Sequence, residues 1–470
     1  MMHEFGDVEL GDERLNNRFL DIVGAMASSP GAPFAGLFAQ ESAVEAVYRF
    51  MRNPKVQWED ILGAHVEQTR ERCAQAGSVV VIHDTTTHRL CAEAEIESYI
   101  NTGKKGFLGH TSLAVENRGG GRPLGVLAME CVLRAQKSSK LRKKGRPLSG
   151  AETARLKNKE YDRWLRGIEA SHEQMGDDVE VVHVIDREGD SFGLFGRLAV
   201  TDKCFVIREC KNRLGRLAGS NSEEWAPVDE LLKQARKTHL QREVYLGRRD
   251  QKTAPGNAKA NPARANRMAH LRIAYASLEL RRPGYLKSDD CPPTVTVNVV
   301  HVYEVDPPAG EQRIEWVLLT NLPVRSAAEA ERIIDIYRLR WLIEEFFAAL
   351  KGGCRYRQRR LTNRYSIFNT LASMIPIAWK ALDLRQLARF AECKAVEVFD
   401  SIQFDTLVAK ARTMRKRLNR TTSAQEAMLI IARLGGHLKS SGPPGWKTLM
   451  KGMERFLGIA EGYALARAKM

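Results

Sequence analysis

The sequence predicts a mixed α/β core that carries a β-rich insertion and is flanked by helical segments at both ends. Three observations support this fold class. Apolar residues recur at helical spacing in residues 1–75 and again after Ser326. Short apolar runs, typical of buried strands, lie between these two regions. From about residue 210 to 320 the helical periodicity fades, and strand-like segments replace it.

The first 75 residues are expected to form helices. Apolar spacing indicates helices from Asp12 to Met26, from Glu41 to Met51 and from Trp58 to Ala76. The breaks between them contain Pro and Gly, which end helices. This segment has 12 acidic and 7 basic residues, so it is net acidic. The positive charge of the chain therefore lies after residue 75.

The central part of the chain reads as strands with one helix. A helix is expected from Asn158 to Met175, and basic loops from Lys137 to Arg146 and from Arg248 to Arg267. The strands expected in the core are Ser78–His83, Thr111–Val115, Leu124–Leu133, Val179–Ile185 and Cys204–Arg208. Those expected in the insertion are Glu243–Leu246, His270–Leu280, Thr294–Val305 and Ile314–Thr320. We place domain limits at residues 1–75, 76–365 and 366–470, with the last domain helical.

Composition restricts the function classes. The net charge of +16 favours a polyanionic partner such as nucleic acid. We expect no membrane association, because no apolar run approaches the ~18 residues of a spanning helix. The N-terminus lacks an apolar signal core, so export is not expected. The eight cysteines show no CxxC spacing, which argues against a zinc site or a disulfide framework and favours the cytoplasm.

Two aspartates follow buried apolar runs. Asp84 comes after Ser78–His83, and Asp186 comes after Val179–Ile185. Because ligands gather beyond the ends of strands in α/β sheets, the two carboxylates are candidate ligands for a hard divalent cation. The alternative is that each aspartate caps a turn after its strand. Glu188 and Asp190 compete for the ligand role.

A polar stripe is expected on one helix from Ala327 to Leu350 and at its C-terminal edge. Tyr337, Arg340, Glu344 and Lys351 are offset by 3, 7 and 14 residues from the first of them. At about 100° per residue they fall within roughly 60° of one another. The alternative is a solvated face in which Arg340 and Glu344 pair four residues apart.

The four residues Tyr337-x2-Arg340-x3-Glu344-x6-Lys351 resemble the YREK signature of bacterial DDE transposases of the insertion-sequence-four family. Other segments resemble the family in the same order along the chain. They are Leu10-Gly-Asp12, Tyr48 to Pro54, Asp84-Thr-Thr86, Asp186-Arg-Glu188, Trp316 to Thr320, Ile334 to Tyr337, Arg340-Trp341, Ile343 to Phe346 and Ile431 to Gly436. The resemblance therefore extends from the first helix to the last sixth of the chain.

The resemblance implies an RNase H-like catalytic core with a β insertion before the glutamate-bearing helix. It implies that Asp84, Asp186 and Glu344 form the catalytic triad and bind two Mg²⁺ ions, for which Mn²⁺ can substitute. The implied reaction is cut-and-paste transposition, in which phosphodiester hydrolysis and transesterification excise the element through a DNA hairpin and then join it to target DNA. A metal nuclease of RNase H-like type without strand transfer, and an inactive DNA-binding regulator, remain alternatives.

The resemblance also implies DNA-binding roles. Trp316 would stack on a base flipped out at the hairpin, and its alternative is a core aromatic on a strand. The side chains that would grip the DNA around this base are Tyr337, Arg340, Lys351, Arg208 and Lys211. Residues 1–75 would recognise the inverted repeats at the element ends. The helices from Ala424 to Ala468 would pair two protomers into a homodimer on double-stranded DNA, in the cytoplasm of a bacterium at its nucleoid.

Overall fold

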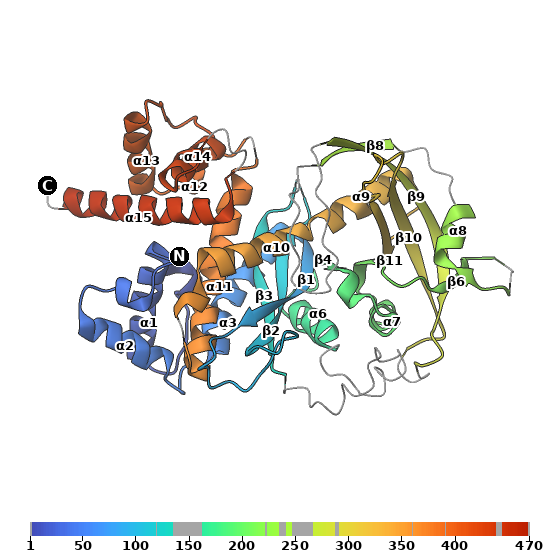
Figure 1. Cartoon of the computed structure of the whole chain (residues 1–470), viewed down its shortest axis with the longest axis horizontal. Helices are drawn as coiled ribbons and strands as arrows, with labels where there is room; N and C mark the ends of the chain where they lie inside the picture. The colour runs from blue at the N-terminus through green and yellow to red at the C-terminus, as the bar shows by residue number, and fades with distance from the viewer. Residues whose placement is uncertain are drawn as a thin grey trace. The chain divides into compact units, whose positions relative to one another are not determined.

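The computed structural model describes residues 2–118, 120–134, 162–220, 223–234, 241–246, 267–286, 291–359, 361–390, 392–438 and 444–468. The chain forms two compact units with a mixed α/β fold, as predicted (Figure 1). Unit 1 comprises Met1–Gly145, Arg166–Glu180 and Trp341–Met470, and unit 2 comprises Arg146–Leu165 and Val181–Arg340. The expected basic loop from Lys137 to Arg146 lies outside the described residues, as does the other basic loop up to residue 266.

The N-terminal helices of unit 1 begin and end close to the predicted limits. They are α1 (Glu13–Ser28), α2 (Glu41–Met51) and α3 (Trp58–Ala76), with short 3₁₀ turns η1 (Met2–Phe5) and η2 (Phe34–Gly36). Asp12 caps α1 by accepting a hydrogen bond from the backbone N–H of Arg14 at 2.8 Å. The three helices share an aromatic core in which Phe19 packs against Phe5 and Phe50 at centroid distances of 5.1 and 5.9 Å.

An antiparallel meander of β1 (Ser78–Arg89), β2 (Gly106–Glu116) and β3 (Pro123–Val132) follows, with β2 in the middle. The prediction that the first strand ends at His83 is wrong. Strand β1 continues because β2 pairs along its whole length, from Val79 opposite Glu116 to Arg89 opposite Gly106. Asp84 therefore lies inside the strand, opposite Thr111.

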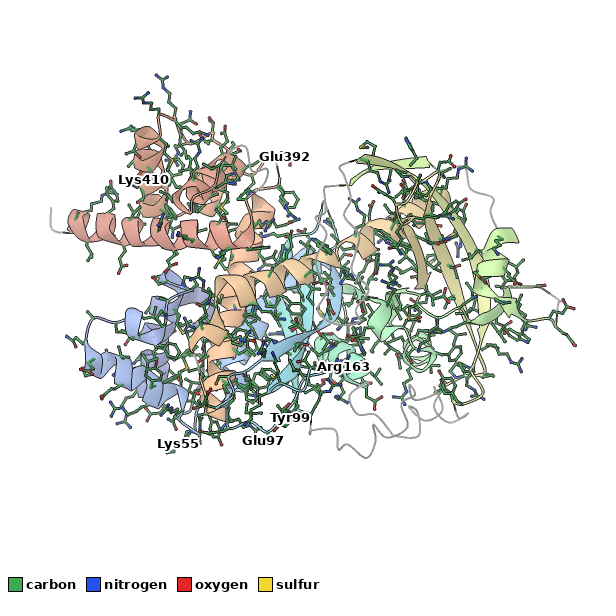
Figure 2. The ribbon with its side chains drawn as sticks, viewed as in Figure 1. Lys55, Glu97, Tyr99, Arg163, Glu392 and Lys410 are labelled. Atoms are coloured by element: carbon green, nitrogen blue, oxygen red, sulfur yellow. The ribbon has the colours of Figure 1, made fainter. Side chains whose placement is uncertain are left out.

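The rest of unit 1 is helical, as predicted. Helix α11 (Arg364–Leu387) is buried over most of its length and packs against α2, α3 and β3. The elements around it are α10 (Trp341–Ala348), the π-helical turn η4 (Ala349–Gly353), the 3₁₀ turn η5 (Tyr356–Arg359), α12 (Ala395–Val398), α13 (Ser401–Thr413), α14 (Ala424–Leu434) and α15 (Trp446–Ala468). A separate core that includes Phe399, Leu407, Ile431 and Phe456 joins the last four helices. Charged side chains such as Lys55 and Lys410 project from the ribbon (Figure 2).

Unit 2 contains the predicted β insertion. Its strands run in the order β4-β5-β11-β10-β9-β6-β7, and β8 pairs with β9. β4 (Glu180–Ile185) and β5 (Cys204–Arg208) are parallel, while β9 (Arg267–Arg281), β10 (Thr294–Glu304) and β11 (Glu315–Thr320) are antiparallel neighbours. The remaining elements are η3 (Arg187–Gly189), α7 (Phe192–Val200), β6 (Leu214–Leu217), β7 (Ala226–Pro227), α8 (Val228–Gln234), β8 (Gln241–Leu246) and α9 (Ala327–Arg338). Helix α6 (Arg163–Glu173) spans the limit between the units.

The single helix predicted from Ala327 to Leu350 is wrong, because it is broken at Leu339 and Arg340. Helix α9 begins with a capping box formed by Ser326 and Glu329. At its end the backbone N–H groups of Leu339 and Arg340 bond to carbonyls three residues earlier, at 3.2 and 3.0 Å. This tightening ends the regular helix, and α10 begins at Trp341. The polar stripe therefore does not lie on one regular helix face.

The meander predicts how acid affects stability. His88 on β1 is buried. Its Nδ1 shares a 2.7 Å hydrogen bond with the Tyr356 hydroxyl, and its ring stacks on Phe107. Burial, with a smaller contribution from the charge of Lys351, lowers the pKa of His88 to about 3. The unfolded chain takes up this proton near pH 6.5, whereas the folded chain does not, so stability falls as the pH drops below 6.5. The loss from His88 is about 2 kcal/mol between pH 7 and pH 5.

Urea denaturation at both pH values checks this expectation. We expect His88→Gln to lose about 2 kcal/mol less than the wild type over this interval, whatever its stability at pH 7. His437→Gln, on the segment after α14, is the matched control and should keep the wild-type difference. An unchanged pH dependence in His88→Gln would contradict a neutral buried imidazole.

Candidate active site

Asp84 is presented by the middle of β1. Asp84 is only 7% exposed, and its Oδ1 accepts a hydrogen bond from the backbone N–H of Thr85 at 2.7 Å. The apolar residues of the preceding half-strand, Val79 to Ile82, are fully buried and fix the strand in the core of unit 1. The sequence thus places a carboxylate where the buried half of the strand gives way to its polar half.

Glu344 and Glu345 are neighbours on α10 with opposite environments. Glu345 is buried, and its Oε1 lies 2.8 Å from Arg389 Nη2 and 3.7 Å from Arg385 Nη2 at the end of α11. Glu344 is exposed. A buried carboxylate needs such partners, so Glu345 anchors α10 to α11. This anchoring places the preceding residue, Glu344, on the accessible side of the helix.

Lys351 brings Asp84 and Glu344 together electrostatically. It lies in η4, and its Nζ donates a hydrogen bond to Thr86 Oγ1 on β1, two residues after Asp84. Loss of surrounding water lowers the pKa of Lys351, while the negative charges of Glu344 and Asp84 act in the opposite direction. In unit 1 the charges of two predicted site residues, Asp84 and Glu344, therefore act on the ammonium group of a third, Lys351. Sequence reasoning assigned no role to Thr86, although it lies within the Asp84-Thr-Thr86 motif.

Asp186 lies in unit 2, directly after β4, as predicted. It is half-buried, and its Oδ1 accepts a hydrogen bond from the backbone N–H of Glu188 at 2.8 Å. The aspartate therefore caps η3, which is the alternative that the sequence left open. Capping uses one acceptor site of a carboxylate that has about four, so it is compatible with binding a cation.

Asp190, which competes with Asp186 for the ligand role, is instead bound to neighbouring protein groups. It is fully buried and forms an ion pair with Arg213, whose Nη2 lies 2.6 Å from its Oδ1. Its Oδ2 accepts hydrogen bonds from the backbone N–H groups of Cys210 and Lys211 at 2.7 and 3.1 Å. Asp190 thus fixes the segment after β5, and with it the exposed side chain of Lys211. The ion pair with the buried Arg213 gives Asp190 a structural role. Glu188 is exposed, with Arg163 Nη2 at 3.5 Å.

Trp316, Arg208 and Tyr337 form an aromatic and cationic cluster in unit 2. The Arg208 guanidinium carbon lies 5.8 Å from the ring centroid of Trp316, and Tyr337 meets this ring edge-on at 5.7 Å. Trp316 is half-buried, so it is not a core aromatic sealed from solvent. Burial raises the pKa of Tyr337, the charges of Arg340 and Arg208 oppose this, and that of Asp186 adds to it. The cluster therefore lies within electrostatic reach of Asp186 and Arg340.

Within each unit, the carboxylates predicted as ligands have donor atoms that suit a hard cation. Asp84, Asp186 and Glu344 offer only oxygen, which Mg²⁺ and Mn²⁺ prefer. In unit 1, Asp84 and Glu344 already share the field of one cation, the ammonium of Lys351. Among the described residues, no three His, Cys, Asp or Glu side chains are grouped closely enough to hold a metal ion.

The chain matches two family models. A transposase DNA-binding model matches residues 1–56, and a transposase DDE domain model matches residues 127–375, more than half of the 470 residues. Among solved structures, the chain is similar to a piggyBac transposase in a cryo-EM structure of its synaptic complex with hairpin DNA. The identity is 10%, the match covers 98% of this chain and 73% of that one, and the TM-score is 0.37. In the described parts of the chain, no helix has the length and apolar character to span a membrane.

The two aspartates after β4 should differ in their effect on stability. Asp190→Ala leaves Arg213 buried without its partner, so we expect a loss of about 3–5 kcal/mol in the free energy of unfolding. Asp186→Asn keeps an acceptor for the cap of η3 and should stay within about 0.5 kcal/mol of the wild type. Urea denaturation of the two variants tests this difference. Equal losses would show that Asp186 is also structural.

Proposed function

Because the chain belongs to the transposase DDE domain family, we propose that it is a cut-and-paste transposase of the insertion-sequence-four type. Membership gives it an RNase H-like catalytic core that cuts DNA and transfers strands, and domains of this family generally use divalent metal ions. The match of residues 1–56 adds a DNA-binding segment.

The arrangement around Lys351 is the observation that carries the proposal. Asp84 and Glu344 come from β1 and α10, 260 residues apart in the chain, and still act on one ammonium group. We propose that these two carboxylates, with Asp186, hold two Mg²⁺ ions, for which Mn²⁺ can substitute. Bound there, the ions would activate a water or a DNA 3′-hydroxyl and stabilise the leaving oxygen of an in-line displacement at phosphorus.

Residues around the triad would bind and orient the DNA. Trp316, held edge-on by Tyr337, offers the half-buried ring on which a flipped base can stack during hairpin formation. Arg208 beside it, with Arg340, Lys351 and Lys211, would bind the backbone phosphates on either side of that base. A ring that is only partly covered supports a hairpin intermediate over simple hydrolysis.

Transposition would require two protomers to assemble on the two ends of the element. We propose that residues 1–75 recognise the inverted repeats and that two protomers pair through α14 and α15 on double-stranded DNA before they capture the target. Exposed Tyr463 and Leu465 near the end of α15 support a protein contact there, since exposed apolar side chains favour association. We place the protein in the bacterial cytoplasm, at the nucleoid when it is bound to DNA.

Glu344→Gln tests the triad on linear DNA that carries the native inverted repeats, with Mg²⁺. The variant keeps the shape of the side chain but removes its charge, so cleavage at the ends should slow by roughly 10³-fold or more. Nicked, hairpin and strand-transfer products are separated on denaturing gels. Glu173→Gln, an exposed position on α6, is the matched control and should cut at the wild-type rate.

The products also discriminate between functions. If the wild type leaves its true ends intact, the proposal is overturned in favour of an inactive DNA-binding regulator. If it nicks the DNA but forms neither hairpins nor joined products, a metal nuclease of RNase H-like type is favoured instead.

Trp316→Ala should separate hairpin formation from the first nick. Loss of a stacked base costs about 1–3 kcal/mol, so hairpin yield should fall roughly ten- to hundredfold while nicking continues. Trp316→Phe keeps a π-face and should restore part of the yield. Trp225→Ala removes another tryptophan of unit 2 that contacts an arginine, with Arg216 4.9 Å from its ring centroid, and should form hairpins normally. Equal hairpin yields in Trp316→Ala and wild type would contradict the stacking role.

A further inference from the structure

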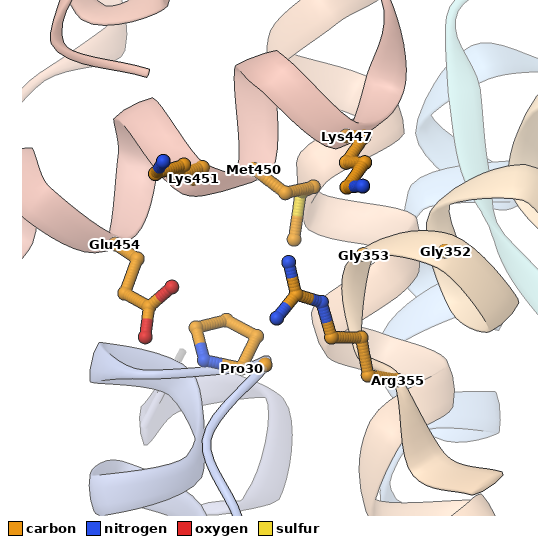
Figure 3. A pocket seen from close by; sticks show the side chains of 9 residues that line it. Pro30, Gly352, Gly353, Arg355, Lys447, Met450, Lys451 and Glu454 are labelled. Carbon is orange, nitrogen blue, oxygen red and sulfur yellow. The ribbon is translucent and has the colours of Figure 1, made fainter. Parts of the chain in front are cut away.

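A small pocket in unit 1 gathers cations from segments far apart in the sequence. Arg355 follows η4, and Lys447 and Lys451 lie on α15. In the view of Figure 3 the Arg355 guanidinium points into the pocket below Met450, and the two lysines lie on the helix above it. The pocket thus has three positive side chains and one carboxylate, Glu454, in its lining. Its net positive charge favours an anion.

Among the described residues, no acidic side chain forms an ion pair with these three cations. Within the described residues, the side chains of Arg355, Lys447 and Lys451 have no ion pair and no hydrogen bond. By contrast, Arg389 in unit 1 is paired with Glu345. Like charges repel one another, and a bound anion would offset this repulsion. The three cations, against one carboxylate in the lining, therefore favour an external negative partner.

Two glycines, Gly31 and Gly353, line the pocket near Arg355. A Cβ on Gly31 would lie 3.4 Å from Gly353 O and 3.5 Å from Arg355 Cδ, so a side chain there would enter the space beside the guanidinium. A Cβ on Gly353 would lie 2.7 Å from Met450 Cγ, which shows how closely α15 packs on η4. The absence of a side chain at Gly31 leaves room beside the guanidinium for a compact oxyanion.

The walls of the pocket are fixed from both sides. Arg359 is buried, and its Nη2 donates hydrogen bonds to Pro30 O and Ala32 O at 3.2 and 2.8 Å, on either side of Gly31. Its guanidinium also lies 4.8 Å from the ring centroid of Phe34. These contacts hold the loop after α1 against η5, while Met450 holds α15 against η4. A pre-formed site loses little conformational entropy on binding.

We propose that this pocket binds one backbone phosphate of the DNA, so that α15 takes part in DNA binding. The proposal rests on the proposed function, because DNA is the phosphate source it names. η4 leads directly from Lys351, which bonds Thr86 near Asp84, into Gly352 and Gly353 of the pocket. A strand whose scissile phosphate lies at the carboxylates would therefore have further phosphates within reach of the same turn. An acidic protein segment is disfavoured, because one arginine and two lysines around a single small pocket suit one oxyanion better than a row of carboxylates.

Quantitative binding to a duplex with the native inverted repeat tests the pocket. The double variant Lys447→Ala and Lys451→Ala should bind roughly fivefold more weakly at 0.1 M KCl, and its slope of log affinity against log salt should be smaller by about 1. Arg197→Ala with Lys233→Ala, two exposed cations on α7 and α8, is the charge-matched control and should keep the wild-type slope. An equal slope in the pocket variant and the wild type would overturn the proposal.

Two further measurements separate a specific contact from general charge. Gly31→Ala adds a methyl group at ordinary contact distance and no charge, so it should fold and still weaken binding roughly threefold by blocking the pocket. Methylphosphonate substitution should weaken wild-type binding at one backbone position and have no effect there in the lysine double variant. If no position loses its effect, the pocket holds no backbone phosphate. If the wild type itself binds no DNA, the proposed function fails, and not only this site.

Discussion

Two carboxylates that face one ammonium group organise the candidate site of unit 1. Asp84 and Glu344 repel each other, and the positive charge of Lys351 offsets this repulsion. The hydrogen bond from Lys351 to Thr86 fixes that charge beside β1. In the proposed site, a divalent ion bound to these oxygens would compete with the ammonium of Lys351. A displaced ammonium would then be available to a phosphate, which would link metal binding to DNA binding through a single side chain.

Arginines decide which of the neighbouring acids can act. Glu345 is held by Arg385 and Arg389, and Asp190 is held by Arg213, while the adjacent Glu344 and Asp186 stay accessible. Buried carboxylates are stable only with such partners, so these pairs anchor α10 and the segment after β5. The accessible acids can be aimed because the paired ones are rigid.

Local periodicity predicted those parts of the fold in which neighbours along the chain determine structure. Helices α1 to α3 and strands β9 to β11 follow the expected limits, because one face or one run of each is buried. The end of β1 was misplaced, since pairing with β2, and not hydrophobicity, extends that strand through its threonines. The break at Leu339 was missed because the apolar pattern continues across it. Partners of Glu345, about 40 residues away, leave no local trace in the sequence.

The net charge of a stretch of sequence does not determine the electrostatic potential at the folded surface to which it contributes. The N-terminal 75 residues are net acidic, although residues 1–56 match a DNA-binding model. One of these acids is paired within the segment, since Glu4 Oε1 lies 2.7 Å from Arg72 Nη1. Later segments then bring cations to the same region, as Arg355 and Arg359 do at the Pro30–Ala32 loop. Folding therefore places positive charge beside the DNA-binding segment that its own sequence lacks, and phosphate binding depends on that combined surface.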